Sequence, residues 1–128
     1  MNNTMKKKIL IVEDDNFLQK ALGYALQENN FEIFSAVDGE EAMVLAKKES
    51  LDLILLDIIL PKKDGFEVLE DLKADTKLAK IPVIFITNLG QREDVKKGLD
   101  LGAVGYIIKA HFKISDIINK INEVLNIK

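Results

Sequence analysis

The sequence predicts an α/β domain in which a parallel β-sheet carries helices on both faces. Short apolar runs alternate with helical patterns along all 128 residues, at about 20 to 30 residues per unit. Three of the runs are continuously apolar, which is typical of parallel strands that are buried on both faces. Right-handed crossovers restrict the possible topologies, but the pattern alone does not fix the order of the strands.

The apolar runs are the predicted strands. The run Glu32-Ile-Phe-Ser-Ala36 mixes polar and apolar residues, which favours a strand at the edge of the sheet. The three continuously apolar runs predict strands buried on both faces. The predicted strands cover residues 9–12, 32–36, 53–56, 83–86 and 104–108.

The helices are predicted from apolar spacing and from residues that can cap a helix. The first follows the apolar spacing between residues 17 and 26. Asp38 can cap the second helix, with Glu41 three residues later as the partner of a capping box. The dipeptide Asp64-Gly65 opens the third helix.

The last two predicted helices differ in strength. The fourth, over residues 91–101, is the weaker because it has few apolar anchors and contains Gly98. The last has one continuous apolar stripe at helical spacing. The residues of that stripe are Ile114, Ile117, Ile118, Ile121, Val124 and Leu125.

Composition excludes several classes of site. The absence of cysteine excludes disulfides, thiolate metal sites and cysteine nucleophiles, and one histidine cannot build a histidine-rich metal centre. A net charge of −3 gives no general attraction for nucleic acid, so no direct nucleic-acid binding is expected. The apolar run at 9–12 is too short for a signal peptide. We therefore expect a cytoplasmic protein without membrane contact, with a loose end over residues 1–6.

Polar side chains follow four of the predicted strands. Ligands of open parallel sheets lie beyond the carboxyl ends of the strands, so these residues are expected to meet at one edge. Each one alone has an ordinary explanation as a helix cap, a turn residue or a solvated charge, but their joint placement is harder to explain in that way. The residues are Glu13, Asp14, Asp15, Asp57, Thr87 and Lys109.

This combination of groups suits phosphoryl transfer. Clustered carboxylates repel one another and need a cation, and oxygen ligands in an open pocket suit Mg²⁺. An ionised aspartate is a weak nucleophile, but it can attack a phosphorus atom whose charge is neutralised by Mg²⁺ and a lysine ammonium. The expected product is an aspartyl phosphate.

Several sequence blocks resemble the signature of receiver domains, the phosphoacceptor modules of two-component response regulators. The similarity covers about residues 7 to 125 and implies a single receiver domain over 1–128, with a five-stranded parallel sheet in the flavodoxin-like order 2-1-3-4-5 flanked by five helices. The blocks are Ile9-Leu-Ile-Val-Glu-Asp-Asp15, Leu55-Leu-Asp-Ile-Ile-Leu-Pro-Lys-Lys-Asp-Gly65, Pro82-Val-Ile-Phe-Ile-Thr87 and Gly105-Tyr-Ile-Ile-Lys109.

The resemblance implies a phosphorylation site and a metal site. Asp57 matches the phosphoacceptor and would also contact the metal. Asp14 matches a direct Mg²⁺ ligand, and Glu13 its partner acting through water. The backbone carbonyl of Ile59 matches a further ligand, and Mn²⁺ is expected to substitute for Mg²⁺. Asp15 lies one residue past the acidic pair and is interpreted as a helix cap.

The resemblance also implies catalytic and switch residues. Thr87 matches the residue that binds the phosphoryl group and relays its presence, and Lys109 matches the lysine that pairs with the acceptor or the phosphoryl oxygens. Tyr106 matches the family's switch aromatic.

The sequence departs from the family pattern near the predicted site. Ala110 stands where proline usually follows the lysine, so we expect a trans bond between Lys109 and Ala110, because a cis bond costs about 2.5–4 kcal/mol without proline. Asn88 is larger than the residue common there. Ile59 and Leu89 are apolar at positions that flank the path of the hydrolytic water, which leaves the phosphoryl lifetime open.

The interpretation is a stand-alone signalling switch with only self-phosphorylation and self-dephosphorylation chemistry, and not a metabolic enzyme. The expected donor is a sensor histidine kinase or a phosphotransfer protein. The expected output is a protein target that binds the fourth helix, fifth strand and fifth helix.

Three alternatives are open. A pseudo-receiver would only dock partners, and Ala110 keeps this possibility. A Mg²⁺-dependent aspartyl-phosphate phosphohydrolase would want an acid at position 59, where the chain has Ile59. A flavodoxin-like cofactor binder would need a phosphate-cradling loop where the three acids lie.

Overall fold

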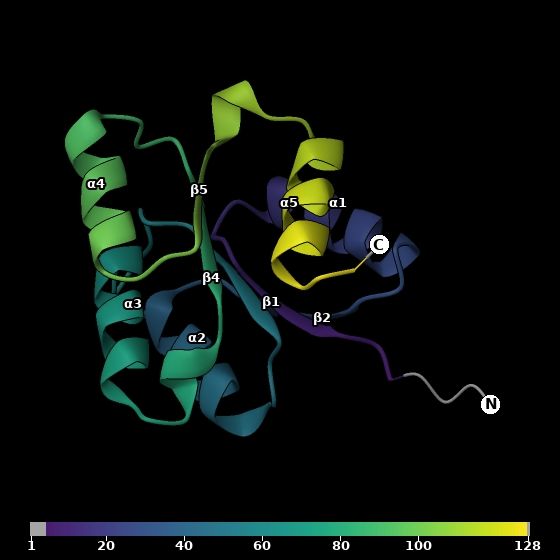
Figure 1. Cartoon of the computed structure of the whole chain (residues 1–128), viewed down its shortest axis with the longest axis horizontal. Coiled ribbons are helices and arrows are strands. Elements are labelled where there is room, and N and C mark those ends of the chain that lie inside the picture. Colours follow the sequence, from purple (N-terminus) through teal and green to yellow (C-terminus); the bar gives the residue numbers. More distant parts are fainter. Residues whose placement is uncertain (1–4, 128) are drawn as a thin grey trace.

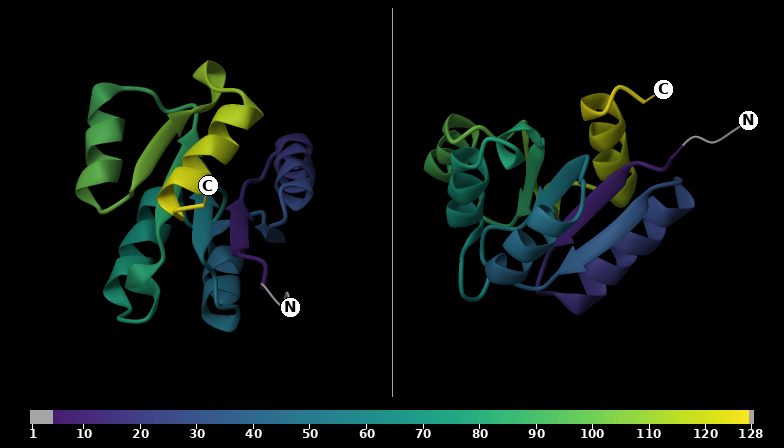
Figure 2. Two further views of the ribbon diagram at one scale, coloured as in Figure 1. Left: turned by 45° about the vertical axis from the view of Figure 1, so that its right-hand side comes forward. Right: turned by 90° about the horizontal axis from the view of Figure 1, so that it is seen from below.

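Five parallel strands form one sheet between two layers of helices (Figures 1 and 2). The computed structural model describes residues 5–127, so most of the predicted loose end lies outside the described residues. The strand order is β2-β1-β3-β4-β5, which confirms the order implied by the resemblance. The strands are β1 (Lys8–Val12), β2 (Glu32–Ala36), β3 (Leu53–Leu56), β4 (Val83–Thr87) and β5 (Gly105–Ile108).

The helices cover both faces of the sheet, as predicted. In Figure 1, α1 and α5 lie on one side and α2, α3 and α4 on the other. Within residues 5–127, no helix is long and apolar enough to cross a membrane. The helices are α1 (Asn16–Glu28), α2 (Gly39–Lys48), α3 (Gly65–Ala74), α4 (Arg92–Asp100) and α5 (Ile114–Val124), with short 3₁₀ turns η1 (Leu78–Lys80) and η2 (Lys109–His111).

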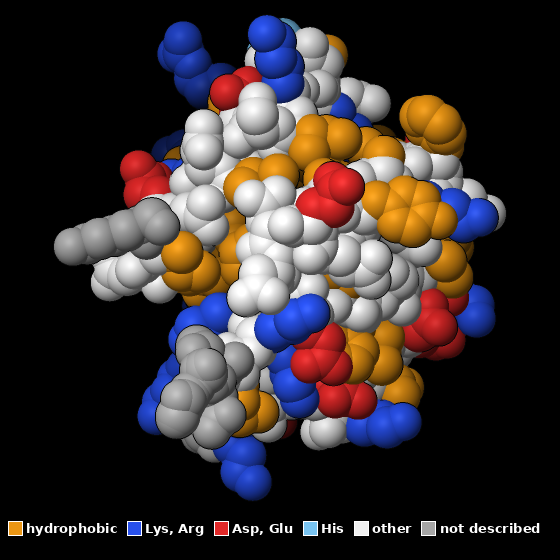
Figure 3. Space-filling model, turned by 90° about the vertical axis from the view of Figure 1, so that its right-hand side faces the viewer, with side chains coloured by type: hydrophobic (Ala, Val, Ile, Leu, Met, Phe, Trp, Pro, Cys, Tyr) orange, Lys and Arg blue, Asp and Glu red, His pale blue; other side chains and the backbone are white. Residues whose placement is uncertain are grey.

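One apolar layer lies on each face of the sheet, because successive side chains of a strand point to opposite faces. In β1, Leu10 and Val12 pack toward α2 and α3, whereas Ile9 and Ile11 pack toward α1 and α5. Strand β2 is only half-buried and lies at one end of the sheet, which confirms its prediction as an edge strand. Figure 3 shows the side of the molecule that carries α1 and α5, where apolar side chains lie between charged ones.

Aspartates begin the first three helices, as expected. The Asp15 carboxylate accepts hydrogen bonds from the N–H groups of Phe17 and Leu18 at the start of α1. Asp64 and the side chain of the third residue of α3 form a complete capping box. Asp38 accepts from the Glu41 N–H, but the Glu41 side chain accepts from the residue before Asp38. The predicted capping box of α2 is therefore only half formed, because the Glu41 side chain binds the N–H of Val37 instead of that of Asp38.

Helix α4 approaches the sheet through a glycine. Gly98 is the one buried residue of this helix, and a Cβ atom there would lie 3.0 Å from a ring carbon of Phe85 and 3.1 Å from one of Tyr106. The Lys97 ammonium lies over the Phe66 ring, 4.4 Å from its centroid. Helix α4 has few apolar side chains, which made it the weaker prediction, and it packs on the sheet through the close approach of its backbone at Gly98.

Gly65 holds the first turn of α3 against the end of β3, and we expect Gly65→Ala to destabilise the protein. A Cβ atom at this position would lie 2.3 Å from the Asp57 carbonyl oxygen and 2.7 Å from the Ile58 Cα, both backbone atoms. The expected loss is about 1–3 kcal/mol in the free energy of unfolding, measured by urea denaturation.

Gly23→Ala is the matched control for this substitution. Gly23 lies inside α1, where a Cβ atom would meet only Ile33 Cγ2 at 3.9 Å. Alanine is the better helix former, so this variant should gain up to about 1 kcal/mol. Equal effects of the two substitutions would contradict the close contact at Gly65.

Candidate functional site

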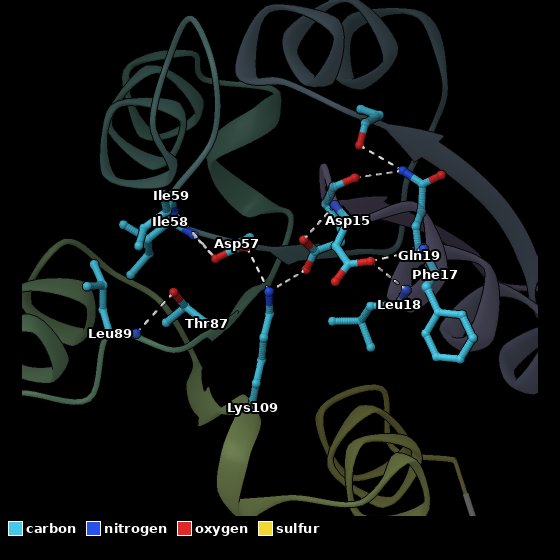
Figure 4. Close-up of polar contacts among 12 residues, drawn as sticks. Asp15, Phe17, Leu18, Gln19, Asp57, Ile58, Ile59, Thr87, Leu89 and Lys109 are labelled. Atoms are coloured by element: carbon cyan, nitrogen blue, oxygen red, sulfur yellow. Dashed lines mark hydrogen bonds and ion pairs between the residues drawn. The ribbon is translucent and has the colours of Figure 1, made fainter.

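The predicted site residues meet at the carboxyl edge of the sheet, where the segments after β1, β3 and β5 converge (Figure 4). Ligand oxygens of Glu13, Asp14 and Asp57 lie within 4.8 Å of one another. The Lys109 ammonium reaches into this group from the segment after β5. The structure therefore brings together three acids and one amine that are far apart in the sequence.

Asp57 is held at the end of β3 by bonds to its backbone and to both carboxylate oxygens. Its N–H donates to the Val12 carbonyl at 3.0 Å, which continues the pairing of β1 and β3 by one residue. Its Oδ1 accepts from the Ile58 N–H at 2.7 Å and from the Ile59 N–H at 3.4 Å. Its Oδ2 accepts from Lys109 Nζ at 2.9 Å. This carboxylate is buried and has a fixed orientation.

Lys109 bridges two buried carboxylates. Its Nζ lies 2.9 Å from Asp57 Oδ2 and 2.7 Å from Glu13 Oε1. Burial alone would lower the pKa of the Lys109 ammonium, but its contacts with Glu13 and Asp57 outweigh burial and raise that pKa. The described peptide bonds are all trans, including Lys109–Ala110, as predicted. Lys109 is therefore directed at Asp57 without a following proline.

Glu13 is almost fully buried at the end of β1, with 1% of its surface exposed. Its Oε2 accepts from the Asp15 N–H at 3.1 Å. Its Oε1 is close to Lys109 but, among the described residues, has no partner in aligned hydrogen-bond geometry. Burial raises the pKa of this carboxyl, and the nearby Lys109 ammonium only partly offsets that effect. A buried oxygen with spare acceptor capacity suits a further cation.

The three acids fit a hard divalent cation. Asp14 is exposed, and its carboxylate makes no hydrogen bond or ion pair with any residue in the described range 5–127. Oxygen-only ligands on a partly open edge are the set that Mg²⁺ prefers, because it keeps several of its waters. The Ile59 N–H contacts Asp57, whereas a metal role of the Ile59 carbonyl stays a prediction.

Thr87 and Tyr106 both contact the backbone of Leu89. Thr87 is fully buried at the end of β4, and its Oγ1 accepts from the Leu89 N–H at 3.4 Å. The Tyr106 hydroxyl donates to the Leu89 carbonyl at 2.5 Å, and the Tyr106 ring lies 5.7 Å from that of Phe85. The two predicted switch residues are thus joined through one residue of the segment between β4 and α4.

The Tyr106 phenol should titrate at unusually high pH. Burial, assisted by the negative charges of Asp94 and Asp57, raises the pKa of Tyr106 to about 12, because these surroundings disfavour the phenolate. The chain has two tyrosines, so ultraviolet absorbance of a Tyr24→Phe variant reports Tyr106 alone. A midpoint near 10, the ordinary pKa of a tyrosine, would contradict the partly buried and hydrogen-bonded position of this phenol.

Sequence reasoning missed one residue at this edge. The Gln19 side chain lies between the ends of β1 and β2, where its amide nitrogen donates to the Glu13 carbonyl at 2.9 Å and to the Ala36 carbonyl at 3.1 Å (Figure 4). The one signal in the sequence is a polar residue one helical turn after Asp15, between apolar positions of α1. That signal is too common to identify a functional residue.

Comparisons with known proteins agree with this geometry. The family model of the response regulator receiver domain matches residues 9–122. A probable transcriptional regulator of Porphyra purpurea, ycf29, is 45% identical over 105 residues, which cover 82% of this chain and 50% of that protein. The chain thus spans about half the length of this curated relative.

Solved structures of receiver domains and response regulators also superpose closely on this chain. The receiver domain of a sensor histidine kinase from Pseudomonas aeruginosa, with a magnesium ion coordinated in its active-site cleft, superposes with a TM-score of 0.86 at 25% identity, covering 94% of this chain and 98% of that one. The phosphorylated cyanobacterial phytochrome response regulator RcpA gives a TM-score of 0.82 at 34% identity, covering 94% of both chains.

Proposed function

Since the chain belongs to the response regulator receiver domain family, we propose that it is a phosphorylation-dependent signalling switch whose phosphoacceptor is Asp57. The observation that carries this proposal is the contact of the buried Asp57 carboxylate with Lys109, beside two further acids. These are the groups needed to form an acyl phosphate on an aspartate.

The proposed step is an in-line transfer. A carboxylate oxygen of Asp57 attacks the phosphorus atom of the donor, a new P–O bond forms, and the bond from phosphorus to the donor breaks with its electron pair leaving on the donor. The Lys109 ammonium, already 2.9 Å from Asp57 Oδ2, stabilises negative charge on the transferred group. The Thr87 hydroxyl then donates to a phosphoryl oxygen and leaves its bond with the Leu89 N–H.

The carboxylates of Glu13, Asp14 and Asp57 and the carbonyl of Ile59 would hold Mg²⁺, with Glu13 acting through water. When bound, this ion neutralises charge on the phosphoryl group and orients it, and Mn²⁺ is proposed to substitute. The Asp57 oxygens lie close enough to the other acids to take part in both metal binding and attack.

We propose a sensor histidine kinase or a phosphotransfer protein as the donor. The output is a change in the face formed by α4, β5 and α5, which a protein target reads. The contacts of Thr87 and Tyr106 with Leu89 support this route, because Leu89 lies in the segment that leads from the site to α4. Ile59 favours this switch over a phosphohydrolase, since its exposed apolar side chain cannot serve as an acid or base.

Phosphorylation by a small donor tests the proposal. Acetyl phosphate with Mg²⁺ should add one phosphoryl group to the protein, seen as a mass increase of the intact chain. Removal of Mg²⁺ with a chelator should prevent the increase. A protein whose mass does not change under these conditions would instead be a docking module.

Asp14→Ala should abolish most Mg²⁺ or Mn²⁺ binding. Asp14 has an exposed carboxylate within 4.8 Å of the other two acids, and its loss removes one of the few protein ligands of the ion. Titration of Mn²⁺ by electron paramagnetic resonance measures the change. Asp15→Ser is the control, because it removes the adjacent charge and keeps a helix cap. Undiminished affinity in Asp14→Ala would refute the ligand assignment.

A further inference from the structure

Asp14 is positioned only through the backbone on either side of it. No side-chain hydrogen bond or ion pair of Asp14 occurs within the described part of the chain. The backbone of its neighbours therefore supports it: the Glu13 carbonyl accepts from the Gln19 side chain, and the Asp15 N–H donates to Glu13 Oε2. A metal ligand without direct support depends on the rigidity of these flanking groups.

Gln19 binds the carbonyls on both sides of Asp14. Its side-chain amide donates to the Glu13 carbonyl at 2.9 Å, and its backbone N–H donates to the Asp15 carbonyl at 2.9 Å. The bond to the Asp15 carbonyl is the first backbone bond of α1, whereas the bond to the Glu13 carbonyl is made by the Gln19 side chain and holds the peptide group that precedes Asp14 (Figure 4).

The same amide ties this segment to the neighbouring strand. The Ala36 carbonyl at the end of β2 accepts from the Gln19 amide at 3.1 Å and from the Glu13 N–H at 3.0 Å. The Glu13 backbone is therefore held from both sides, through its N–H by β2 and through its carbonyl by α1. Since the Glu13 side chain is buried at the same point, little freedom is left to the segment that carries the acids.

We propose that Gln19 is a positioning residue for the divalent-cation site, which sets cation affinity by fixing the backbone around Asp14. This inference rests on the proposed function. Gln19 does not touch the ion or the phosphoryl group. It keeps the acidic residues in the arrangement that binds the cation, so that binding needs no ordering of the segment between β1 and α1.

Gln19→Met tests this role, because methionine keeps the length and helix preference of glutamine but has no N–H donor. Mn²⁺ affinity should fall roughly 10-fold or more, the effect typical of losing a group that orients a metal ligand. Gln27→Met is the matched control. Gln27 is an exposed residue of the same helix, away from the acids, and its substitution should leave the affinity unchanged.

Two measurements distinguish a positioning residue from a catalytic one: the Mg²⁺ concentration needed for half-maximal phosphorylation, and the phosphorylation rate at saturating Mg²⁺. With acetyl phosphate, Gln19→Met should need roughly 10-fold more Mg²⁺ for half-maximal phosphorylation and reach the unsubstituted rate at saturating Mg²⁺. If Gln19→Met does not fold, Gln19→Asn serves instead, because its shorter side chain should not reach the carbonyls of both Glu13 and Ala36 and should weaken binding in the same direction.

Equal Mn²⁺ affinities of the Gln19 and Gln27 variants would overturn the proposal, and so would a lowered maximal rate at saturating Mg²⁺. A loss of thermal stability with unchanged Mn²⁺ affinity would show that Gln19 only anchors α1. Absence of Mn²⁺ binding by the unsubstituted protein would instead contradict the proposed function, so the two failures are distinguishable.

Discussion

Asp57→Asn is expected to abolish phosphorylation by acetyl phosphate altogether. The amide oxygen of asparagine is not an anionic nucleophile, and no other described acid has the same combination of burial, two backbone donors and contact with Lys109. Intact mass after incubation with Mg²⁺ and acetyl phosphate gives the result. The substitution is close to isosteric, so circular dichroism should show an unchanged fold.

Asp100→Asn is the control for this change. Asp100 is an exposed residue of α4 that pairs with Lys96, and its substitution should leave phosphorylation intact. A phosphorylated Asp57→Asn protein, with the label mapped to Asp14 or Asp15, would show that another carboxylate is the acceptor.

Lys109→Met should give the largest loss of stability at the site in metal-free protein. The ammonium lies between Glu13 and Asp57, whose side chains are 1% and 5% exposed, and its removal leaves two buried carboxylates facing each other. Breaking such a buried pair costs on the order of 3 kcal/mol in the free energy of unfolding, which urea denaturation in the presence of a chelator would measure.

The same variant should keep its Mn²⁺ affinity but respond poorly to acetyl phosphate, because the ammonium acts on the phosphoryl group and not on the cation. Lys96→Met, which breaks the exposed pair with Asp100, should change neither stability nor phosphorylation measurably. A Lys109→Met protein as stable as Lys96→Met would show that the two carboxylates do not depend on this ammonium.

The strands could be predicted closely because each is a short apolar run with clear ends. The strand Leu53–Leu56 has the bounds expected from the sequence, while β4 extends to Thr87, where the chain still pairs with Ile108. The strand order could not come from the pattern, because strands buried on both faces look alike in sequence. The resemblance to receiver domains supplied that order. The 3₁₀ turn Leu78–Lys80 is too short to leave a periodic signal and was missed.

The acids and Lys109 at the site could be predicted because they directly follow strands, and the ends of parallel strands meet at one edge. Gln19 lies inside a helix, and its role depends on the end of β2 coming next to the end of β1, which only the folded chain shows. The contact of Lys109 with Glu13 was not predicted, since the resemblance paired the lysine only with Asp57 or the phosphoryl oxygens.

The glycine contact of α4 has a consequence for the way the domain opens. Detaching this helix from Phe85 and Tyr106 uncovers parts of those two rings but no fully buried apolar side chain of α4 itself, because its one buried residue is a glycine. Subglobal opening of α4 therefore requires less free energy than unfolding of the sheet, whose interior strands are buried on both faces. We therefore expect the backbone amides of α4 to exchange with solvent deuterium faster than those of β3 and β4. In that case, the helix next to the proposed phosphorylation site would open as a unit of its own before the sheet unfolds.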